Sequence, residues 1–407
     1  MTTTLYPRAL RRVIEADLAV YPVVALLGAR QVGKSTLGRE IAADRGMPVR
    51  TLDDRDVRAQ ALADPEGLLA DMNGGGFIDE AQRAPGLFLA LKALVDRDQR
   101  PGQFLLSGSN QPTMSQAVGD SLLGRAAYRT LRPLTLNEQR LSEEHDGWDA
   151  LFAATDDDAL TRLASRAQAS GALDWRDVVT TGGFPRVLAQ PLAQRRRLLD
   201  DYVEVYSNRD VRELLAINSS ERFEQLFRLL AARTGQELNV NGLASALGVD
   251  ARTVRRWIDA LARSFLVETI PAWSRNASQR VIKSPKLYLA DVALALAAAR
   301  EAVPTGFHLE TLVVGDALVW RDMQPGRAAH HWRTQSQQEV DLILEWHGRL
   351  VPIEIKAGNR VDASDARHLR TFLQLHAEST RAVLLSGDPD LRMLPSNVLA
   401  APWWAVL

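Results

Sequence analysis

The chain has 407 residues, which is enough for two to four domains of roughly 100 to 200 residues each. Hydrophobic residues make up 46% of it and charged residues 24%, so the composition excludes whole-chain disorder and fibrous repeats. It contains no cysteine, which excludes disulfides, thiolate zinc sites, iron–sulfur clusters and cysteine nucleophiles.

The formal net charge of −1 conceals an uneven distribution of charge along the chain. Residues 141–180 carry three arginines against nine acidic residues, whereas residues 221–290 carry eleven basic against six acidic residues. Residues 1–22 contain charges throughout, and no apolar run approaches the length of a membrane span. We therefore expect a cytoplasmic protein that does not associate with membranes, with an anionic partner near the basic stretch.

Strand-like runs alternate with helical segments in the first 140 residues, at 23–28, 49–54, 76–80, 103–108 and 126–131. This alternation predicts an α/β domain over residues 1–140, built on a parallel sheet with helices on both faces. The acidic residues 141–175 have weak periodicity, which predicts an exposed excursion outside the core. Residues 176–235 have apolar residues at three- and four-residue spacing, which predicts a helical lid or linker.

A phosphate-binding motif follows the first predicted strand. Residues 28–35 fit the pattern G-x-x-x-x-G-K-[ST] and precede a helix-forming run. Gly28 and Gly33 let the backbone wrap a phosphate, Lys34 reaches the terminal phosphates, and Ser35 ligates Mg²⁺. The sequence therefore predicts ATP and Mg²⁺ as cofactors, and the predicted nucleotide-binding residues are Gly28, Ala29, Arg30, Gln31, Val32, Gly33, Lys34, Ser35 and Thr36.

Two further strands end in polar residues. Asp79 and Glu80 close the run at 76–80, where Asp79 would hold Mg²⁺ and Glu80 would polarise the attacking water as general base. This pair predicts hydrolysis and not binding alone. After the next strand, Ser109 and Asn110 could sense the terminal phosphate, although the same residues also make a good turn.

The strings at 28–36, 78–82, 106–110, 122–138 and 182–185 resemble a large prokaryotic family of AAA+ superfamily ATPases with a poorly characterised C-terminal region. The resemblance implies an additional-strand sheet in the order 5-1-4-3-2 and places Pro185 near the adenine, although residues 182–185 also fit a turn that starts a helix. It also implies that Arg125 approaches a terminal phosphate, with Arg129 and Arg132 as rivals. Such an arginine often comes from a neighbouring subunit, which implies a homo-oligomer such as a ring. A carboxylate partner for Arg125 is the competing interpretation.

Residues 236–295 carry a helix-turn-helix signal, with a turn at 248–250 and a second helix capped by Asp250. Its pattern predicts a winged helix that binds DNA, with Val254 and Trp257 facing the core. A nucleotide lid or a subunit joint is the alternative. The predicted DNA contacts are Arg252, Thr253, Arg255, Arg256, Arg280, Lys283 and Lys286.

The last predicted domain, residues 300–407, resembles the PD-(D/E)xK nuclease superfamily. Glu354 and Lys356 are two apart on a predicted strand, Asp341 lies across a hairpin turn at 347–348, and Glu310 lies on the preceding helix. These carboxylates would hold a second divalent metal, Mg²⁺ or Mn²⁺, with Lys356 beside the attacking water. The chain has only five lysines, which adds weight to the motif. A nuclease fold that serves only as a binding platform is the alternative.

These patterns together predict a Mg²⁺-dependent AAA+ ATPase that acts on DNA, with a C-terminal domain that either cuts or only binds. The competing hypothesis is a nucleotide-operated signalling switch that binds protein partners.

Overall fold

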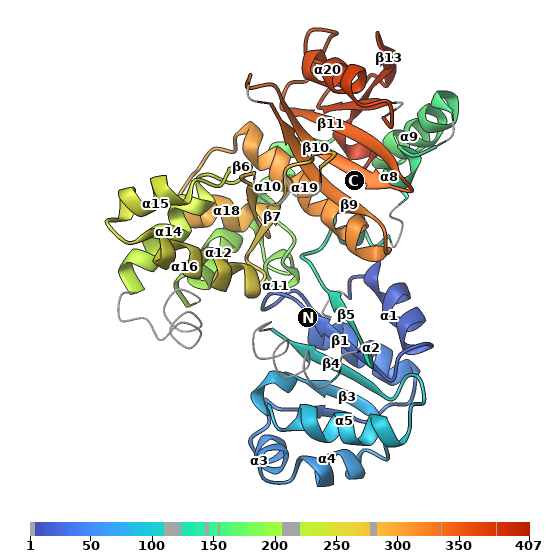
Figure 1. Ribbon diagram of the computed structural model, residues 1–407, viewed down its shortest axis with the longest axis vertical. Helices are drawn as coiled ribbons and strands as arrows, with labels where there is room; N and C mark the ends of the chain where they lie inside the picture. The colour runs from blue at the N-terminus through green and yellow to red at the C-terminus, as the bar shows by residue number, and fades with distance from the viewer. Residues whose placement is uncertain are drawn as a thin grey trace. The chain divides into compact units, whose positions relative to one another are not determined.

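The computed structural model describes residues 5–109, 122, 124–142, 146–153, 155–205, 220–276, 283–334, 336–379 and 381–407. The chain divides into two compact units (Figure 1). The first unit consists of Tyr6–Pro133 with Arg263–Phe265, and the second of Leu134–Ala262 with Leu266–Leu407. No helix in these described ranges is long and apolar enough to cross a membrane.

The first unit is built on a parallel sheet of five strands, in the order β2-β3-β4-β1-β5. This order confirms the prediction of 5-1-4-3-2. Every residue of β1, β3 and β4 is buried, because helices cover both faces of the sheet. The strands are β1 (Val23–Leu27), β2 (Val49–Thr51), β3 (Gly76–Asp79), β4 (Phe104–Gly108) and β5 (Ala126–Thr130).

Helices pack against each face of this sheet. Leu68, Leu69 and Leu91 lie in one core with strand residues such as Ile78 and Leu106. On the other face, α2 packs against β3 and β4, with Gly38 against the ring of Phe77. The elements are α1 (Leu10–Leu18) and α2 (Lys34–Asp44) on one face, and α3 (Arg55–Ala63), α4 (Pro65–Asp71) and α5 (Leu87–Arg97) on the other, with the 3-10 turn η1 (Ala81–Arg83) after β3.

The second unit opens with the acidic segment 141–175, where the prediction of an exposed excursion is wrong. Trp148 and Trp175 are 0% and 2% exposed and lie in the same hydrophobic core as the C-terminal sheet. Asp156, Asp157 and Asp158 occupy the first turn of α9, where negative charge favours the helix N-terminus. These acidic residues weaken the apolar pattern of the segment. The helices are α7 (Leu136–Gln139), α8 (Gly147–Ala150), α9 (Asp156–Ser170) and α10 (Trp175–Thr181).

The middle of the second unit is mainly helical, as the periodicity predicts, and it contains a three-stranded antiparallel sheet in the order β6-β8-β7. Helices α15 (Val240–Leu247) and α16 (Ala251–Arg263) are joined by a turn in which Gly248 has a φ of 62°. The other elements are α11 (Pro185–Leu188), α12 (Leu192–Val205), α14 (Ser220–Ala231), β6 (Gln236–Glu237), β7 (Val267–Ile270), β8 (Lys286–Leu289) and α18 (Val292–Ala299).

A mixed sheet of six strands forms the rest of the second unit, in the order β13-β14-β12-β11-β10-β9. Helix α19 packs on one face and α20 on the other, and each face has its own apolar core. Trp403 and Trp404 are buried in the first of these cores. The elements are α19 (Gly306–Met323), β9 (Ala328–Arg333), β10 (Glu339–Trp346), β11 (Arg349–Lys356), α20 (Arg367–Leu375), β12 (Ala382–Ser386), β13 (Arg392–Leu394), β14 (Val398–Pro402) and η3 (Trp403–Ala405).

Candidate functional site

The loop between β1 and α2 has the backbone that phosphate binding requires. Gly28 and Gly33 have φ values of 150° and 101°, which side chains other than glycine rarely adopt. A Cβ on Gly28 would lie 2.3 Å from the carbonyl oxygen of Leu131, so the loop also packs closely on the end of β5. Gln31 is left-handed as well, with a φ of 66°. The loop therefore curls at the N-terminus of α2, where helix amides favour an anion.

The ammonium group of Lys34 lies inside this loop. Its Nζ donates to the carbonyl oxygens of Gly28 and Ala29, at 2.9 and 2.8 Å. Burial lowers the pKa of Lys34 to about 8, although Glu80 and Asp79 oppose this shift. Two neutral carbonyls satisfy a buried ammonium less well than an anion does, so the site favours a phosphate group beside Lys34.

Oxygen groups suited to Mg²⁺ meet between α2 and the end of β3. The hydroxyl of Ser35 donates to Asp79 Oδ1 at 2.9 Å, and Ser107 donates to the same oxygen. The side chain of Asp79 is almost completely buried, and Arg39 lies 3.8 Å from its other oxygen. Hydroxyl and carboxylate oxygens are the ligands that Mg²⁺ takes in nucleotide sites, so Ser35 and Asp79 fit the predicted metal.

Glu80 follows β3 in a left-handed conformation, with a φ of 56°. Its backbone N–H donates to the Ser107 hydroxyl at 3.3 Å. Its carboxylate accepts from the Ser109 hydroxyl at 3.4 Å and from the amide of Gln82. Ser109 thus lies beside the predicted base, whereas Asn110, the other predicted sensor, is outside the described residues. Gln82 was not predicted, and its position two residues after Glu80 was the only available signal.

Arg8 is a second residue that sequence reasoning missed. It is 6% exposed, and its guanidinium donates to the carbonyl oxygens of Val32 and Arg132 at 2.7 and 2.5 Å. It therefore ties the P-loop to the segment after β5. Arg8 is 24 and 124 residues from these partners, so no local pattern in the sequence could have linked them.

The three candidate arginines lie at different positions along β5, before, within and after the strand. Arg125 precedes β5, its carbonyl accepts from the N–H of Val23 at 3.3 Å, and its side chain pairs with Asp96. Arg125 thus lies at the N-terminal ends of β1 and β5, whereas the P-loop follows the C-terminal end of β1. The predicted pairing with a carboxylate is present. Arg129 pairs with Asp17 through two bonds of 2.6 and 2.9 Å. Arg132 follows the C-terminal end of β5, which is the end of the sheet where the P-loop lies.

Residues 182–185 lie in the second unit and start a helix. Gly182 has a φ of 65°, and the N–H of Gly183 donates to Asp291 Oδ2 at 2.6 Å. Pro185 occupies the first turn of α11, where its fixed φ is favourable. The alternative of a turn that starts a helix is therefore observed, and the predicted contact of Pro185 with nucleotide stays a prediction.

Helix α16 has the two faces that the sequence predicts. Val254, Trp257, Ile258 and Leu261 are buried, and Asp250 caps the helix by accepting from the N–H of Arg252 at 2.7 Å. The predicted DNA contacts Arg252, Arg255 and Arg256 are exposed, Thr253 is half-buried, Lys283 is exposed, and Arg280 lies outside the described residues.

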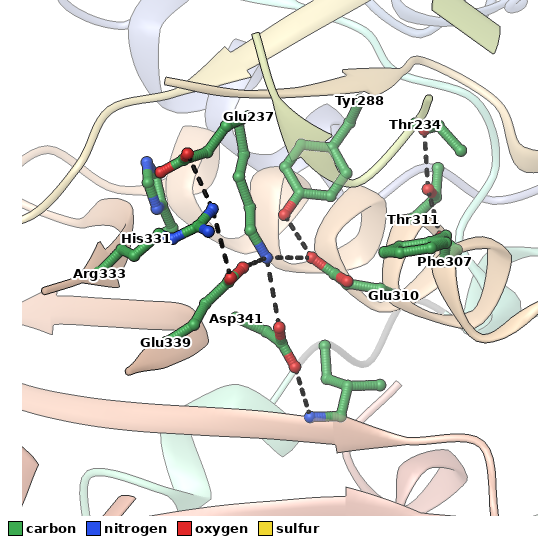
Figure 2. Close-up of polar contacts among 12 residues, drawn as sticks. Thr234, Glu237, Tyr288, Phe307, Glu310, Thr311, His331, Arg333, Glu339 and Asp341 are labelled. Atoms are coloured by element: carbon green, nitrogen blue, oxygen red, sulfur yellow. Dashed lines mark hydrogen bonds and ion pairs between the residues drawn. The ribbon is translucent and has the colours of Figure 1, made fainter. Parts of the chain in front are cut away.

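The prediction that Lys286 contacts DNA is wrong. Lys286 is 2% exposed, and its ammonium lies 2.8 Å from Glu310, 2.6 Å from Glu339 and 3.2 Å from Asp341. Figure 2 shows these carboxylates converging on one nitrogen. Burial alone would lower the pKa of Lys286, but Tyr288 and the three carboxylates raise it well above its ordinary value.

The predicted nuclease residues do come together in the second unit. Asp341 Oδ2 accepts from the N–H of Ile355 at 3.0 Å, which places it between Glu354 and Lys356 on the neighbouring strand. The hairpin turns at His347 and Gly348, both at positive φ, as predicted. Lys356 Nζ lies 2.7 Å from Glu354 Oε1.

Two of these carboxylates have pKa values above the ordinary range. Burial, reinforced by Asp341, raises the pKa of Glu354 to about 8 and that of Glu310 to about 7. Tyr288 also donates to Glu310 Oε1 at 2.7 Å. No three His, Cys, Asp or Glu side chains within the described ranges are arranged to hold a metal ion. The predicted second metal therefore does not fit this arrangement, in which Lys286 occupies the centre of the carboxylates.

Three families match consecutive parts of the chain. The family described as AAA domain matches residues 20–139. A domain of unknown function (DUF8612) matches residues 172–304, and another (DUF4143) matches residues 305–405. The first match covers the P-loop and the end of β3. Together with the geometry of Lys34, Ser35 and Asp79, it identifies this part of the chain as a P-loop ATPase domain of the AAA type.

The chain is also similar to several solved structures. For the Walker-type ATPase PABY2304 of Pyrococcus abyssi, identity is 15%, the TM-score is 0.43, and 73% of this chain and 99% of that chain are covered. For the RuvB Holliday junction branch migration motor of Thermotoga maritima, identity is 20%, the TM-score is 0.27, and coverage is 72% and 93%. For AMPPCP-bound DnaA from Aquifex aeolicus, identity is 16%, the TM-score is 0.26, and coverage is 64% and 89%.

Two curated relatives match nearly the whole chain. They are "Uncharacterized protein Mb2031c" of Mycobacterium bovis and "Uncharacterized protein Rv2008c" of Mycobacterium tuberculosis. Each is 31% identical over 396 residues, covering 94% of this chain and 80% of the relative. The chain therefore belongs to the family of these two mycobacterial proteins, as a member with an ATPase domain of the AAA type.

Proposed function

We propose that this ATPase couples Mg²⁺-dependent ATP hydrolysis in the first unit to DNA binding through α16 of the second. The observation that carries the DNA assignment is the division of α16 into a buried apolar face and an exposed face with three arginines. The helix-turn-helix of α15 and α16 beside the sheet β6-β8-β7 supports a winged helix.

In the hydrolysis step, each residue of the first unit has a separate task. Lys34 would leave its loop carbonyls for the β- and γ-phosphates, and Ser35 and Asp79 would hold the metal that neutralises them. Glu80 would accept a proton from the attacking water, with Gln82 and Ser109 fixing the orientation of its carboxylate. Bound Mg²⁺ would supply electrostatic stabilisation of the charge on the phosphates.

Arg125 serves a neighbouring subunit in this proposal. It lies beside Val23, five residues along β1 from Gly28, which is about 17 Å of strand at roughly 3.3 Å per residue. An arginine side chain does not span that distance, so Arg125 could approach only the phosphate of another copy. Given the role that the resemblance implies for Arg125, this position supports the proposed oligomer.

The DNA assignment is tested by fluorescence anisotropy with duplex, forked and four-way DNA at low salt. Arg255→Ala and Arg256→Ala should each weaken binding and lower the slope of log affinity against log salt by about one for each phosphate that the variant no longer neutralises. The matched control is Arg162→Ala, which removes an exposed arginine of α9 that pairs with Asp158. The absence of DNA binding at low salt, or equal binding by all three variants, would refute the assignment.

The C-terminal sheet supports a nuclease-like fold that acts as a binding platform. Helix α19, the antiparallel strands β9, β10 and β11, helix α20 and the parallel strand β12 follow one another in the chain, and they bring Asp341, Glu354 and Lys356 together. We do not propose cleavage, because the carboxylates are engaged by Lys286 and the second metal does not fit.

This inert platform favours one second candidate function, a nucleotide-operated switch that binds protein partners. The two functions differ in what ATP promotes. The switch requires ATP-dependent capture of a protein and the same ATP turnover with and without nucleic acid, whereas the first proposal requires DNA-dependent turnover.

A further inference from the structure

Lys286 belongs to a different part of the fold from the groups that surround it. It begins β8, which pairs with β6 and β7, whereas Glu310 comes from α19 and the other carboxylates come from β10. Its three N–H donors have three carboxylate partners, Glu310, Glu339 and Asp341. The ammonium thus joins the small sheet to the nuclease-like sheet at one buried point (Figure 2).

The carboxylates around Lys286 are also fixed by other donors. Tyr288 donates to Glu310 at 2.7 Å, the N–H of Ile355 donates to Asp341 at 3.0 Å, and Arg333 lies 3.8 Å from Glu339. Distances of 2.6 to 3.2 Å from the central nitrogen suit N–H···O bonds. Mg²⁺ requires oxygens at about 2.0 to 2.1 Å in octahedral geometry, so an ammonium and a metal could not share this position.

One carboxylate of the centre also lines a cavity. A cavity of about 750 Å³ is lined by Gly235, Phe307, Arg333 and Glu339, among others. Glu339 also contacts Lys286. The cavity therefore borders the centre at Glu339.

We propose that the ammonium of Lys286 is the resident cation of this centre, taking the place of a divalent metal and holding β8 against α19 and β10. While Lys286 is present, the centre takes up no Mg²⁺ or Mn²⁺. This inference goes beyond the proposed function and does not depend on ATP hydrolysis or DNA binding.

The test is calorimetric titration of the full chain with Mn²⁺ in the absence of nucleotide. Two variants remove the ammonium, Lys286→Ala and Lys286→Met, and methionine retains an aliphatic stem. Each should gain one Mn²⁺ site. Its affinity should be at least about 10-fold higher than that of any wild-type site that depends on Asp341. Adding Asp341→Asn should remove the gained site, and adding Asp79→Asn should not. Lys283→Ala, which removes the nearby exposed lysine, should behave like the wild type.

Two results would overturn the proposal. One is a Lys286 variant with wild-type circular dichroism that gains no Mn²⁺ site. The other is a wild-type Mn²⁺ site that Asp341→Asn removes and Asp79→Asn leaves intact. The second measurement needs no Lys286 variant, so it decides the matter even where both substitutions prevent folding.

Discussion

Two buried lysines of this chain have opposite electrostatic environments. Lys34 bonds two neutral carbonyls, and burial lowers its pKa to about 8. Lys286 is equally buried, but three carboxylates raise its pKa well above the ordinary value. The first arrangement leaves an ammonium in need of an anion, as a nucleotide site requires. The second is already neutralised, as an internal joint requires.

The sequence located the first of these lysines and misassigned the second. Lys34 lies in a motif whose spacing alone places its side chain at the phosphates. Lys286 precedes an apolar strand, a position that suits both an exposed and a buried side chain. Its partners are 24, 53 and 55 residues away in the chain, as the positions of Glu310, Glu339 and Asp341 show, so only the folded structure brings them together.

Glu80→Gln tests the proposed general base. The amide keeps the size of the side chain but cannot accept a proton from water, so ATP turnover should fall by about 100-fold or more while ATP affinity changes little. Turnover is measured by phosphate release and affinity by calorimetry. Glu66→Gln, in the first turn of α4, is the matched control and should leave both quantities unchanged. Turnover by Glu80→Gln within about threefold of the wild type would assign the base to another residue.

At the scale of elements, the close approach of α2 to β3 sets the position of the P-loop relative to Asp79. Gly38 of α2 makes it possible, because a Cβ there would lie 2.3 Å from the ring of Phe77. We expect Gly38→Ala to lower the free energy of unfolding by about 1 to 3 kcal/mol through overpacking, although alanine favours helices more than glycine does.

The measurement for Gly38→Ala is urea unfolding, with Gly86→Ala as its control. Gly86 precedes α5 with a φ of −60° and has open space around its Cβ position, so its substitution should change stability by less than about 0.5 kcal/mol. A Gly38→Ala variant as stable as the wild type would show that α2 can move away from β3.

His331 makes the stability of the second unit sensitive to acid. It is 0% exposed, and burial, together with Lys286, lowers its pKa from 6.5 to about 4. Between these values the unfolded chain binds a proton that the folded chain does not, so stability falls as the pH decreases. From near pH 7 to near pH 5, this one group should cost about 2 kcal/mol.

Urea unfolding at the two pH values checks this expectation. His331→Gln should lose less stability on acidification than the wild type, whatever its stability near pH 7. His368→Gln, in helix α20, serves as a control and should retain the wild-type dependence on pH. An unchanged pH dependence in His331→Gln would show that His331 does not cause it.

Among the elements, the sequence predicts best where one pattern runs without interruption. The strands β1, β3 and β4 of the first unit are largely apolar, and all five strands are observed within a few residues of their predicted places. The segment 141–175 was misassigned because its buried side chains, such as Trp148 and Trp175, are separated by acidic residues. Their burial depends on the C-terminal sheet, which no local pattern reveals.

At the scale of the whole molecule, the position of Arg125 predicts that active sites form between copies. Arg125→Ala and Lys34→Ala should each abolish turnover, because one lacks the donated arginine and the other lacks the P-loop lysine. A mixture of the two should recover turnover, since the intact P-loop of one copy can meet the intact Arg125 of another. Phosphate release measured over a series of mixing ratios checks this, and Arg129→Ala is the comparison for a residue already paired with Asp17. A mixture no more active than its components would place the decisive arginine within the same copy.

The ATPase domain could be predicted from the sequence because the P-loop motif follows its first strand, but the joint at Lys286 could not. It depends on a strand of one sheet donating to carboxylates of another. The predicted domain bounds at 140, 175, 235 and 300 stay predictions, because the structure divides the chain only into two units.

The coupling of ATP hydrolysis to DNA is tested most directly by the rate of ATP turnover at low salt, measured with and without forked DNA. We expect the wild-type rate to rise several-fold when DNA is added, and the same amount of DNA to stimulate Arg255→Ala and Arg256→Ala less, while the rate without DNA stays the same. A wild-type rate that does not change with any DNA, in a protein that binds ATP, would contradict the account.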